Sequence, residues 1–506
     1  MSETLELLCW GLLIGLIYAP LLMPRVRAVA MVTLTDLFNT RRIGPLRIPT
    51  AAGLLLLIAA LLAAILLFPA LQAPTEPPAD RIRQLLSFST LLLWYLFSAV
   101  IVMIASISIC RDLDRKLVLL TLTKPVSRAK FMLAKWLSLA LLSGAVTLTA
   151  SILLYARVYS LAPEDPGHEQ RTREEADVYE RVLIARDRIK HPIDQTMLQN
   201  QVSERLRARR EQGMDQDLDE RQLAVLSDEL WIEARAQYWN VNPGRRITRV
   251  FTGLAEARLL DRAIIRYRSD TSRLPPQEML TIHWQIGDGV NTPIFLPGDD
   301  GFVNARAREP FEFWFPTRCI AEDGTLSITI GNPNVDDPFT PEQEFAEPFW
   351  FDQSDGVVIL YPTGTFAMNL FRLSMLIFAS MLLLCSLGLL LSAMLSQSIA
   401  VLAAIVWLIT LLLVGQVSEN IDYLSRSLDS ADPLTLVMFP LSRMLALVLP
   451  DITGNVPVDL LADGLRITPA QAWTGVLTMA GLSGGLILLL AMLALSRREL
   501  GESIRD

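Results

Sequence analysis

The sequence is poor in the residue types that most catalytic and metal sites require. Its 506 residues include three histidines, four cysteines and only five lysines. None of the lysines follows a glycine, so the Gly-Lys-Ser/Thr pattern with which a P-loop binds nucleotide phosphates is missing. The histidines (His168, His191 and His283) have no Cys or His neighbours at the spacing of metal ligands. We therefore expect neither ATP hydrolysis nor a metal site in this chain.

The few cysteines and the excess of acidic over basic residues argue against a disulfide-stabilised domain and a nucleic-acid-binding protein. Three of the cysteines (Cys9, Cys110 and Cys385) lie in or at the end of apolar runs, where a thiol is a small apolar filler. Cys319 stands alone in the polar part of the chain, which excludes an internal disulfide there. With 45 Lys+Arg against 53 Asp+Glu, the net charge is −8, which disfavours phosphate contacts. No nucleic-acid partner is expected.

Long uncharged runs are abundant instead. Hydrophobic residues make up 52% of the chain, and seven uncharged segments approach or exceed the length needed to cross about 30 Å of hydrocarbon. This pattern predicts a polytopic α-helical membrane protein with about seven transmembrane helices. The segments are Leu7–Met23, Ala51–Leu71, Leu85–Cys110, Trp136–Tyr155, Leu373–Met394, Ile399–Val417 and Trp473–Leu495.

The distribution of charge around these segments predicts their orientation. Acidic residues precede the first segment and Arg25 and Arg27 follow it, which favours a retained anchor over a cleaved signal peptide. With the N-terminus outside, the inner loops hold 14 Lys and Arg residues and the short outer pieces hold five. We therefore expect the N-terminus outside and the C-terminus in the cytoplasm.

This topology places residues 158–363 outside the membrane as one soluble α+β insertion. Residues 158–241 are highly charged and carry apolar residues at helix-like spacing, which predicts a helical hairpin or short coiled coil. Residues 242–363 alternate in polarity and are punctuated by turn residues, which predicts a β-sandwich.

The inner region 111–135 has more structure than a simple linker needs. A charged start is followed by an apolar run, a Lys124-Pro125 break and a second basic helix, which predicts a rigid bent element. The alternative is that its cations only anchor the topology. Ahead of the second segment, Arg27–Asn39 places its apolar residues on one helical face and is typical of an interfacial helix.

Together these patterns resemble the ABC-2-type permeases, the membrane subunits of one class of ABC exporters. Members of this family open with an amphipathic elbow helix, and Ala28–Asn39 lies at that place. After the second core span they carry acidic residues, a Leu-rich turn and a Lys/Arg-Pro-Val-Ser-Arg box. The extra first span and the large insertion depart from the common pattern, and the insertion is similar to that of a subgroup with a β-rich outer domain. The matching residues are Asp112, Asp114, Leu119–Arg128, Leu449-Pro450, Gly364–Leu370 and Arg497–Leu500.

The resemblance implies a transport subunit rather than an enzyme, in a bacterial inner membrane. ATP and Mg²⁺ then bind to a separate ATP-binding subunit, and the chain pairs with a second permease copy or a paralogue within the lipid bilayer. No cofactor is expected on this chain, and the substrate stays open. The implied domains are 1–25 (extra helix), 26–157 (elbow and three core helices, with coupling loop 111–135), 158–363 (outer domain) and 364–506 (three helices and a basic tail). The implied coupling residues are Asp112, Asp114, Lys124, Pro125, Ser127, Arg128, Arg41 and Arg42.

A function of a different class is also open: a membrane-anchored extracytoplasmic binding or scaffold protein without transport activity. An adjacent gene for an ATP-binding subunit would favour the permease, and an isolated gene would favour the scaffold.

Two features inside the predicted spans need their own interpretation. Arg372 lies just before the fifth span, close enough to the outer interface for its side chain to snorkel into water. Gly481-Leu482-Ser483-Gly484 in the last span resembles the nucleophile motif of intramembrane serine proteases, but no histidine lies at membrane depth to serve as the base. We interpret these small residues as a close helix-packing surface.

Overall fold

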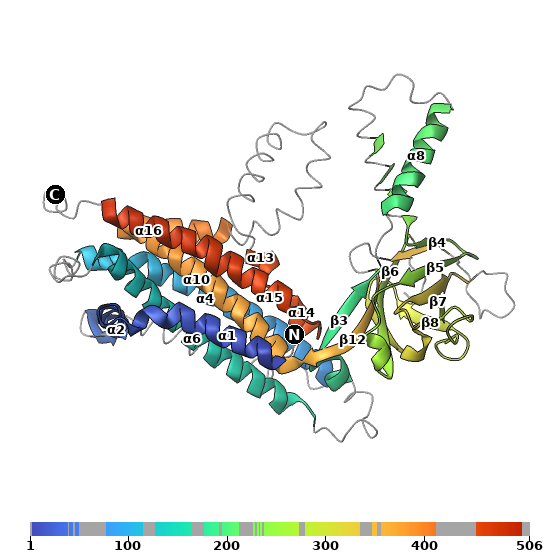
Figure 1. Cartoon of the computed structure of the whole chain (residues 1–506), viewed down its shortest axis with the longest axis horizontal. Coiled ribbons are helices and arrows are strands. Elements are labelled where there is room, and N and C mark those ends of the chain that lie inside the picture. Colours follow the sequence, from blue (N-terminus) through green and yellow to red (C-terminus); the bar gives the residue numbers. More distant parts are fainter. Residues whose placement is uncertain are drawn as a thin grey trace. The chain divides into compact units, whose positions relative to one another are not determined.

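The chain folds into two compact units, and each is described by itself. One, the helical unit, comprises Met1–Ala185 and Gly364–Asp506, and the other, the β-rich unit, comprises Arg186–Thr363 (Figure 1). The computed structural model describes residues 3–38, 40–43, 46–49, 77–114, 127–163, 177–191, 195–211, 226–227, 230–231, 233–234, 237–272, 279–333, 347–351, 356–410 and 452–497.

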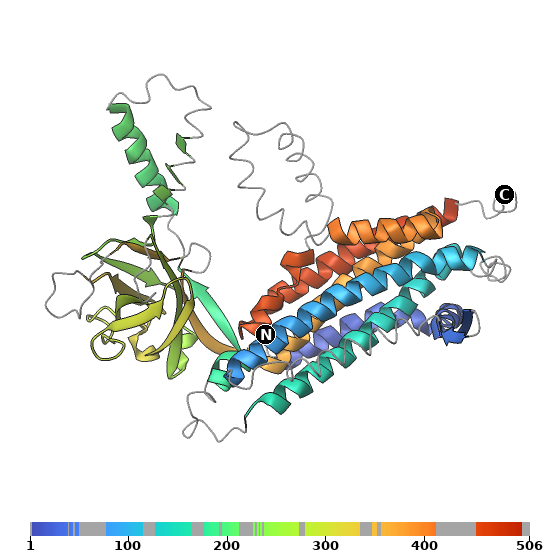
Figure 2. The same cartoon turned by 180° about the vertical axis from the view of Figure 1, so that it is seen from behind.

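Five helical stretches in the described part of the chain are long and apolar enough to cross a membrane. They run side by side in both views of the fold (Figures 1 and 2). Each corresponds to one of the seven predicted segments. Of the other two, Ala51–Leu71 lies outside the described residues, and Ile399–Val417 is described as far as Thr410, within the apolar helix Gln397–Thr410. The five stretches are α1 (Glu3–Tyr18) with η1 (Ala19–Leu22), α4 (Pro78–Asp114), α6 (Arg128–Leu161), α10 (Phe366–Met394), and α15 (Pro469–Val476) continued by η7 (Leu477–Gly484) and α16 (Gly485–Arg497).

Helix α10 is the centre of the helical unit. It is buried along almost its whole length and packs against α4, α6 and the last span. Polar side chains tie it to two of these neighbours, because Ser380 Oγ accepts from Trp94 Nε1 of α4 at 3.3 Å and Ser386 Oγ accepts from Trp136 Nε1 of α6 at 2.9 Å. Such bonds hold helices together where the solvent is hydrocarbon and supplies no competing partner.

Hydroxyl residues mark where three of these helices begin. Ser127 caps α6, Thr365 caps α10, and Thr468 forms a capping box with Gln471 at the start of α15. Each side chain accepts a hydrogen bond from a backbone N–H that the first helical turn leaves without a partner.

Shorter elements complete the helical unit. A helix, α2 (Pro24–Phe38), covers the residues where the interfacial helix was expected. The antiparallel pair β1 (Thr40–Ile43) and β2 (Leu46–Pro49) comes next in the sequence. Before the last span come α13 (Ile452–Asn455) and α14 (Val458–Ala462).

The β-rich unit contains two sheets with a common hydrophobic core. The first sheet has the order β5-β10-β7-β8, and the second has the order β3-β12-β6-β11-β4 with β9 paired to β6. Side chains from both sheets, including Tyr267, Trp284 and Phe351, meet in the core. The strands are β3 (Ile184–Lys190), β4 (Asn240–Val241), β5 (Arg246–Phe251), β6 (Arg262–Thr271), β7 (Met279–Ile286), β8 (Phe302–Arg306), β9 (Pro310–Pro316), β10 (Leu326–Gly331), β11 (Phe349–Phe351) and β12 (Val357–Thr365).

The prediction of helix throughout residues 158–241 is wrong in two places, because Ile184–Lys190 is strand β3 and Asn240–Val241 is strand β4. Residues 158–161 are helical but form the end of α6. Strand β3 is not apparent from the sequence because one of its buried residues is the charged Arg186. Its Nη1 lies 2.9 Å from Glu312 Oε2 on β9. A charge neutralised by a partner far along the chain gives no hydrophobic periodicity. The described helices of this region include η3 (Val178–Val182), a π-helical turn, and α8 (Gln195–Glu211).

Candidate functional site

A buried ion pair joins the end of α4 to the beginning of α6. Lys135 Nζ lies 2.5 Å from Asp112 Oδ2, and both side chains are almost completely withdrawn from the surface. Asp112 is one of the predicted coupling residues, whereas Lys135 was noted only as part of a basic loop. The pair joins α4 and α6, the two helices that precede and follow residues 115–126 in the sequence.

The first residues of α6 make two further contacts of structural weight. Ser127 Oγ accepts from the backbone N–H of Lys130 at 3.3 Å and so fixes the start of the helix. Arg128 Nη1 donates to the carbonyl oxygens of Leu495 at 3.1 Å and Ser496 at 2.8 Å. These carbonyls belong to the last turn of α16, where a cation is favoured by the helix dipole and by the unpaired C=O groups.

A third contact ties the same end of α4 to α10. Ser392 Oγ accepts from the backbone N–H groups of Ile109 and Cys110, each at 3.0 Å. The Cys110 thiol also lies 3.2 Å from the carbonyl oxygen of Ser392. Helices α4, α6, α10 and α16 are thus connected by polar contacts at one end of the bundle, which we call the coupling end.

The structure brings some of the predicted coupling residues together and says nothing of others. Asp112, Ser127 and Arg128 all lie at the coupling end. Lys124 and Pro125 lie outside the described residues, and the side chain of Asp114 does as well. Arg41 and Arg42 are on β1, where the backbone alone is described. Lys135, the partner of Asp112, and the α16 carbonyls, the partners of Arg128, could not be identified from the sequence, because each contact joins separate helices.

The opposite end of the bundle holds a second buried ion pair. Arg372 of α10 forms a two-pronged bond with Glu6 of α1, with Nε 2.8 Å from Oε1 and Nη2 2.5 Å from Oε2. The third nitrogen, Nη1, donates to the carbonyl oxygen of Ile467 at 3.1 Å. Glu6 is 0% exposed and Arg372 is 2% exposed. The expectation that Arg372 snorkels to water is therefore wrong, since its counter-charge comes from a helix more than 360 positions away in sequence.

Neighbouring side chains extend this contact into a network. Trp10 donates from Nε1 to Glu6 Oε1 at 3.3 Å, and its ring stacks on that of Trp473 with centroids 3.9 Å apart. Asn369 donates to the carbonyl oxygen of Leu465 at 2.7 Å and accepts from the N–H of Ile467 at 2.8 Å. Helix α1, α10 and the start of the last span are thereby fixed to one another at this end, which we call the Glu6 end.

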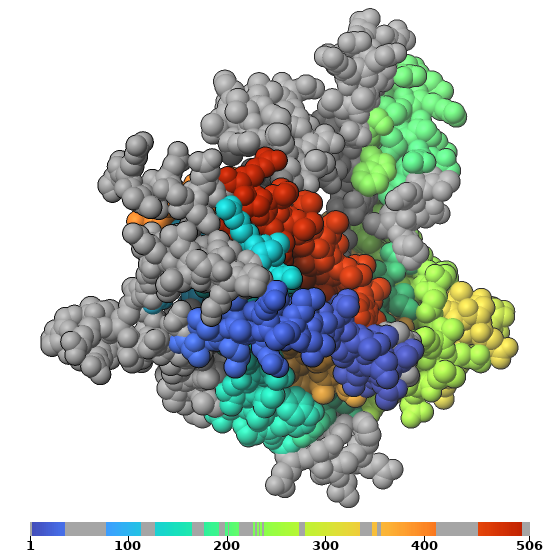
Figure 3. Space-filling model, turned by 60° about the vertical axis from the view of Figure 1, so that its left-hand side comes forward, coloured from blue at the N-terminus to red at the C-terminus, as the bar shows by residue number. Residues whose placement is uncertain are grey.

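Away from this network, α1 makes few close contacts. Glu6 and Trp10 are its buried residues, and its leucines are largely exposed. Figure 3 shows α1 in blue on the surface of the helical unit, between the last span in red and α6 in blue-green. An apolar cavity of about 570 Å³ lies between α1, α6 and α10. Ser151 Oγ and Ser374 Oγ, which line it, lie 2.7 Å apart, and the Tyr18 and Thr147 hydroxyls donate to backbone carbonyl oxygens. These polar groups already have partners, so the cavity favours apolar groups.

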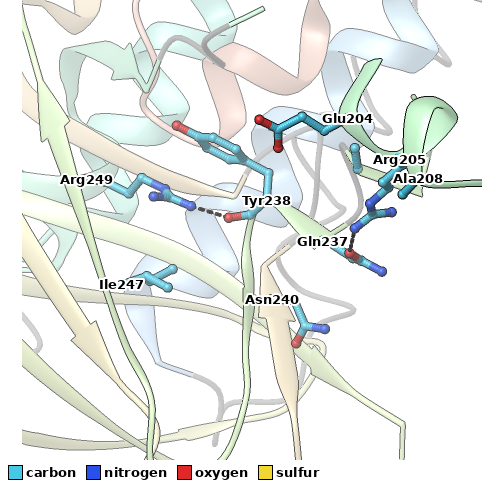
Figure 4. A pocket seen from close by; sticks show the side chains of 9 residues that line it. Glu204, Arg205, Ala208, Gln237, Tyr238, Asn240, Ile247 and Arg249 are labelled. Carbon is cyan, nitrogen blue, oxygen red and sulfur yellow. Dashed lines mark hydrogen bonds between the residues drawn. The ribbon is translucent and has the colours of Figure 1, made fainter. Parts of the chain in front are cut away.

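The β-rich unit has a pocket of about 510 Å³ between α8, β4 and β5 (Figure 4). Arg249 stacks over the ring of Tyr238 at 4.0 Å from its centroid and donates to the Tyr238 carbonyl oxygen at 2.5 Å. Burial lowers the pKa of the Arg249 guanidinium. On the far side of the pocket, Arg205 donates to Gln237 at 2.6 Å. The lining combines cations, amides and the Glu204 carboxylate, which suits binding of a polar molecule.

Neither a metal cluster nor a match to a known protein identifies the chain. Among the described residues, no group of three or more His, Cys, Asp and Glu side chains is arranged to hold a metal ion. No protein-family model, curated protein or solved structure matches the chain. The likeness to ABC-2-type permeases thus rests on the sequence patterns.

Proposed function

We propose that this chain is the permease subunit of an ABC-type exporter of the ABC-2 class. A separate ATP-binding subunit hydrolyses ATP, and this chain uses the resulting movement to export a substrate or to do work on it outside the membrane. The observation that best supports the proposal is the coupling end, where polar contacts tie both flanks of segment 115–126 to the rest of the bundle.

These contacts offer a route for force. In the proposed complex the ATP-binding subunit docks at the cytoplasmic face and pushes on segment 115–126 when it closes on ATP. The Asp112–Lys135 pair makes α4 and α6 respond together. Arg128 passes the displacement to the end of α16, and Ser392 passes it to α10. The Asp112–Lys135 pair and the Ser392 bonds are short and largely shielded from water, so they resist separation better than a surface ion pair does. The two Arg128 bonds are more accessible to water.

The proposal also includes the membrane in which the chain lies and its orientation there. Seven spans cross a bacterial inner membrane with the N-terminus outside, so that the Glu6 end and the β-rich unit are extracytoplasmic. The exposed apolar side chains of the helical unit face lipid or a second permease subunit, which is either another copy or a paralogue. The apolar cavity between α1, α6 and α10 favours an apolar or amphipathic cargo. The exposed apolar side chains proposed to face lipid or a second subunit include Leu8, Leu12, Leu16, Leu148, Ile152, Leu482, Leu486 and Leu493.

Affinity purification of the intact complex in mild detergent tests the proposal. We expect an ATP-binding subunit to co-purify, and its ATPase activity to drive transport once the complex is reconstituted. Recovery of the chain without any ATPase would instead favour the membrane-anchored scaffold.

Charge removal at the coupling end makes the test specific. Arg128→Gln removes the donor to the α16 carbonyls and should lower transport per ATP hydrolysed by about tenfold, the factor that corresponds to one hydrogen bond with a charged partner. Lys130→Gln is the matched control, because Lys130 is exposed on the same turn. Equal transport per ATP in both variants would count against the proposed route.

A further inference from the structure

The apolar cavity of the helical unit is a groove that follows the helices. Its lining residues on α10 recur at intervals of three and four positions, so they form one face of that helix. They are Ala367, Leu370, Phe371, Ser374, Met375 and Phe378. From the first to the last of them the helix rises by about 16 Å. Helix α6 borders the groove over a similar length, from Leu141 to Tyr155. The cavity therefore extends along about half of the thickness of a bilayer.

Helices α1 and α6 close one end of this groove. Tyr18 Oη of α1 donates to the carbonyl oxygen of Ala140 on α6 at 3.0 Å. A Cβ on Gly144 would lie 3.0 Å from the same phenol oxygen, closer than most Cβ contacts, so the phenol fits where α6 has no side chain. A helix that crossed the whole membrane could therefore not pass between α1 and α6 along the groove.

The groove is open along its side and reaches the Glu6 end of the bundle. Leu148 and Ile152 line it, yet they are 63% and 58% exposed. At the Glu6 end the lining reaches Tyr155, whose ring lies 6.3 Å from that of Phe366 at the start of α10. Tyrosine is enriched where membrane spans meet the headgroup region. A molecule in the surrounding bilayer can thus enter the groove from the side.

The lining has no group that would hold a charged or strongly polar molecule. None of the described residues that line the cavity is charged. Ser151 Oγ lies 2.8 Å from the Thr147 carbonyl oxygen, and Ser374 Oγ lies 2.7 Å from that of Leu370, in addition to their contact with each other. A buried water makes about three hydrogen bonds, which these occupied hydroxyls do not offer. The occupant of the groove is therefore apolar.

The size of the groove decides between a protein segment and a lipid chain. A helix with its side chains is about 10 Å across and needs roughly 1,300 Å³ over the length of the groove. The cavity has about 570 Å³, less than half of this volume. An extended acyl chain is a single row of methylene groups and fits. Lipid chains are also the molecules that a bilayer supplies, and an empty cavity of this size would forfeit many packing contacts.

We propose that this groove binds one acyl chain of a bilayer lipid, which lies on α10 between α1 and α6 with its headgroup near Tyr155. The chain fills the space that side chains leave between the extra span and the core helices. The site requires that these helices lie in a bilayer, as they do in the proposed function, but it does not require an ATP-binding subunit.

Photochemical labelling of the full-length protein in phosphatidylcholine nanodiscs tests this site. A small share of the lipid carries a diazirine near the middle of one acyl chain, and mass spectrometry identifies the labelled residues after irradiation. We expect label on Phe371 and Met375, measured relative to the exposed Leu12 of α1. Ala145→Phe and Ala367→Phe each place a ring in the groove and should lower this label about tenfold, the effect of losing about ten close contacts.

Ala156→Phe is the matched control, because Ala156 is also an exposed alanine of α6 but does not line the cavity. Label on Phe371 and Met375 should change by about twofold at most, the usual effect of a surface substitution. Absence of label from these residues in the wild type, as when a protein segment fills the groove, would overturn the proposal. Equal label in all three variants would overturn it as well.

The two blocking variants change different helices, so misfolding of one leaves the other as a test. Co-purification of an ATP-binding subunit does not depend on these alanines. The labelling result thus decides the lipid site, and the co-purification result decides the proposed function.

Discussion

Arg372 lies in the apolar interior of the helical unit, where its charge depends entirely on Glu6 and nearby carbonyl groups. Transfer of a charge from water to such an interior costs several kcal/mol unless a partner compensates it. The two-pronged geometry with Glu6 provides that compensation and also fixes the orientation of α1. Similar reasoning applies to Lys135 and Asp112 at the coupling end.

Loss of one member of the pair should destabilise the helical unit strongly. Glu6→Gln leaves Arg372 buried without a counter-charge and should lower the free energy of unfolding by about 3–5 kcal/mol. The double variant Glu6→Gln, Arg372→Gln should recover much of this loss. Thermal unfolding in nanodiscs measures both.

Glu3→Gln is the control for this prediction, because Glu3 lies on the same helix and is exposed. Its effect should be below about 1 kcal/mol, in the range of surface interactions. Equal losses of unfolding free energy for the Glu3 and Glu6 variants would show that the buried ion pair contributes no more to stability than an exposed carboxylate does.

His283 in the β-rich unit makes stability depend on pH. Burial and, secondarily, the nearby charge of Arg246 lower the pKa of its imidazole, against an opposing effect of Asp300. The folded state then binds fewer protons than the unfolded state, so stability is fully present above the ordinary pKa of about 6.5 and falls as the pH drops below it. Urea unfolding of the β-rich unit, followed by pulse proteolysis, should show a smaller loss between pH 7 and pH 5 for His283→Gln. An identical loss in the variant would contradict this assignment.

At the scale of elements, close approach of backbones organises the bundle. A Cβ on Gly388 of α10 would lie 2.5 Å from Ala105 Cβ and 2.9 Å from the carbonyl oxygen of Val102 on α4. Glycine is therefore required where these two helices cross. Sequence inspection locates such helices but does not show which glycine faces a neighbour.

Enlarging this glycine should force the helices apart. Gly388→Leu should reduce the free energy of unfolding by about 1–3 kcal/mol or more, the cost of inserting atoms into a well-packed core. Gly15→Leu on α1 is the control, since a Cβ there meets nothing within 4 Å. Thermal unfolding of both variants checks the prediction, which fails if Gly15→Leu is the more damaging of the two.

The elements that sequence could predict are those with a strong local signal. Uncharged runs located five described helices, and residues such as Ser127 and Thr365 are recognisable helix caps. Strand β3 was missed because its buried Arg186 is neutralised by Glu312. The partners of Arg372 and Arg128 were missed for the same reason: each contact depends on tertiary structure that no local pattern encodes.

At the scale of the whole molecule, the chain consists of two units with separate hydrophobic cores. It leaves the helical unit within β3, after Ala185, and returns within β12, at Gly364. Strands β3 and β12 are neighbours in one sheet. The two points of connection are therefore close together, as is favourable for a domain inserted into another.

Removal of the β-rich unit should leave the helical unit able to fold. Replacing residues 186–363 by a short Gly/Ser linker should give a protein that inserts into the membrane and still shows the stability difference between Glu6→Gln and Glu3→Gln. Expression and thermal unfolding of the shortened chain measure this. Aggregation of the shortened chain under conditions where the full chain is soluble in detergent would show that the helical unit depends on its insertion.

Helix α10 carries polar anchors at two heights, and their separation has a consequence for the membrane itself. Arg372 and Ser392 are 20 residues apart on this helix, a rise of about 30 Å. The hydrocarbon layer of a typical bilayer has about the same thickness. Because the anchors are fixed to other helices, α10 cannot shorten its apolar stretch by tilting alone. Bilayers that are much thinner or thicker must deform around the protein, so lipid chain length should tune its stability.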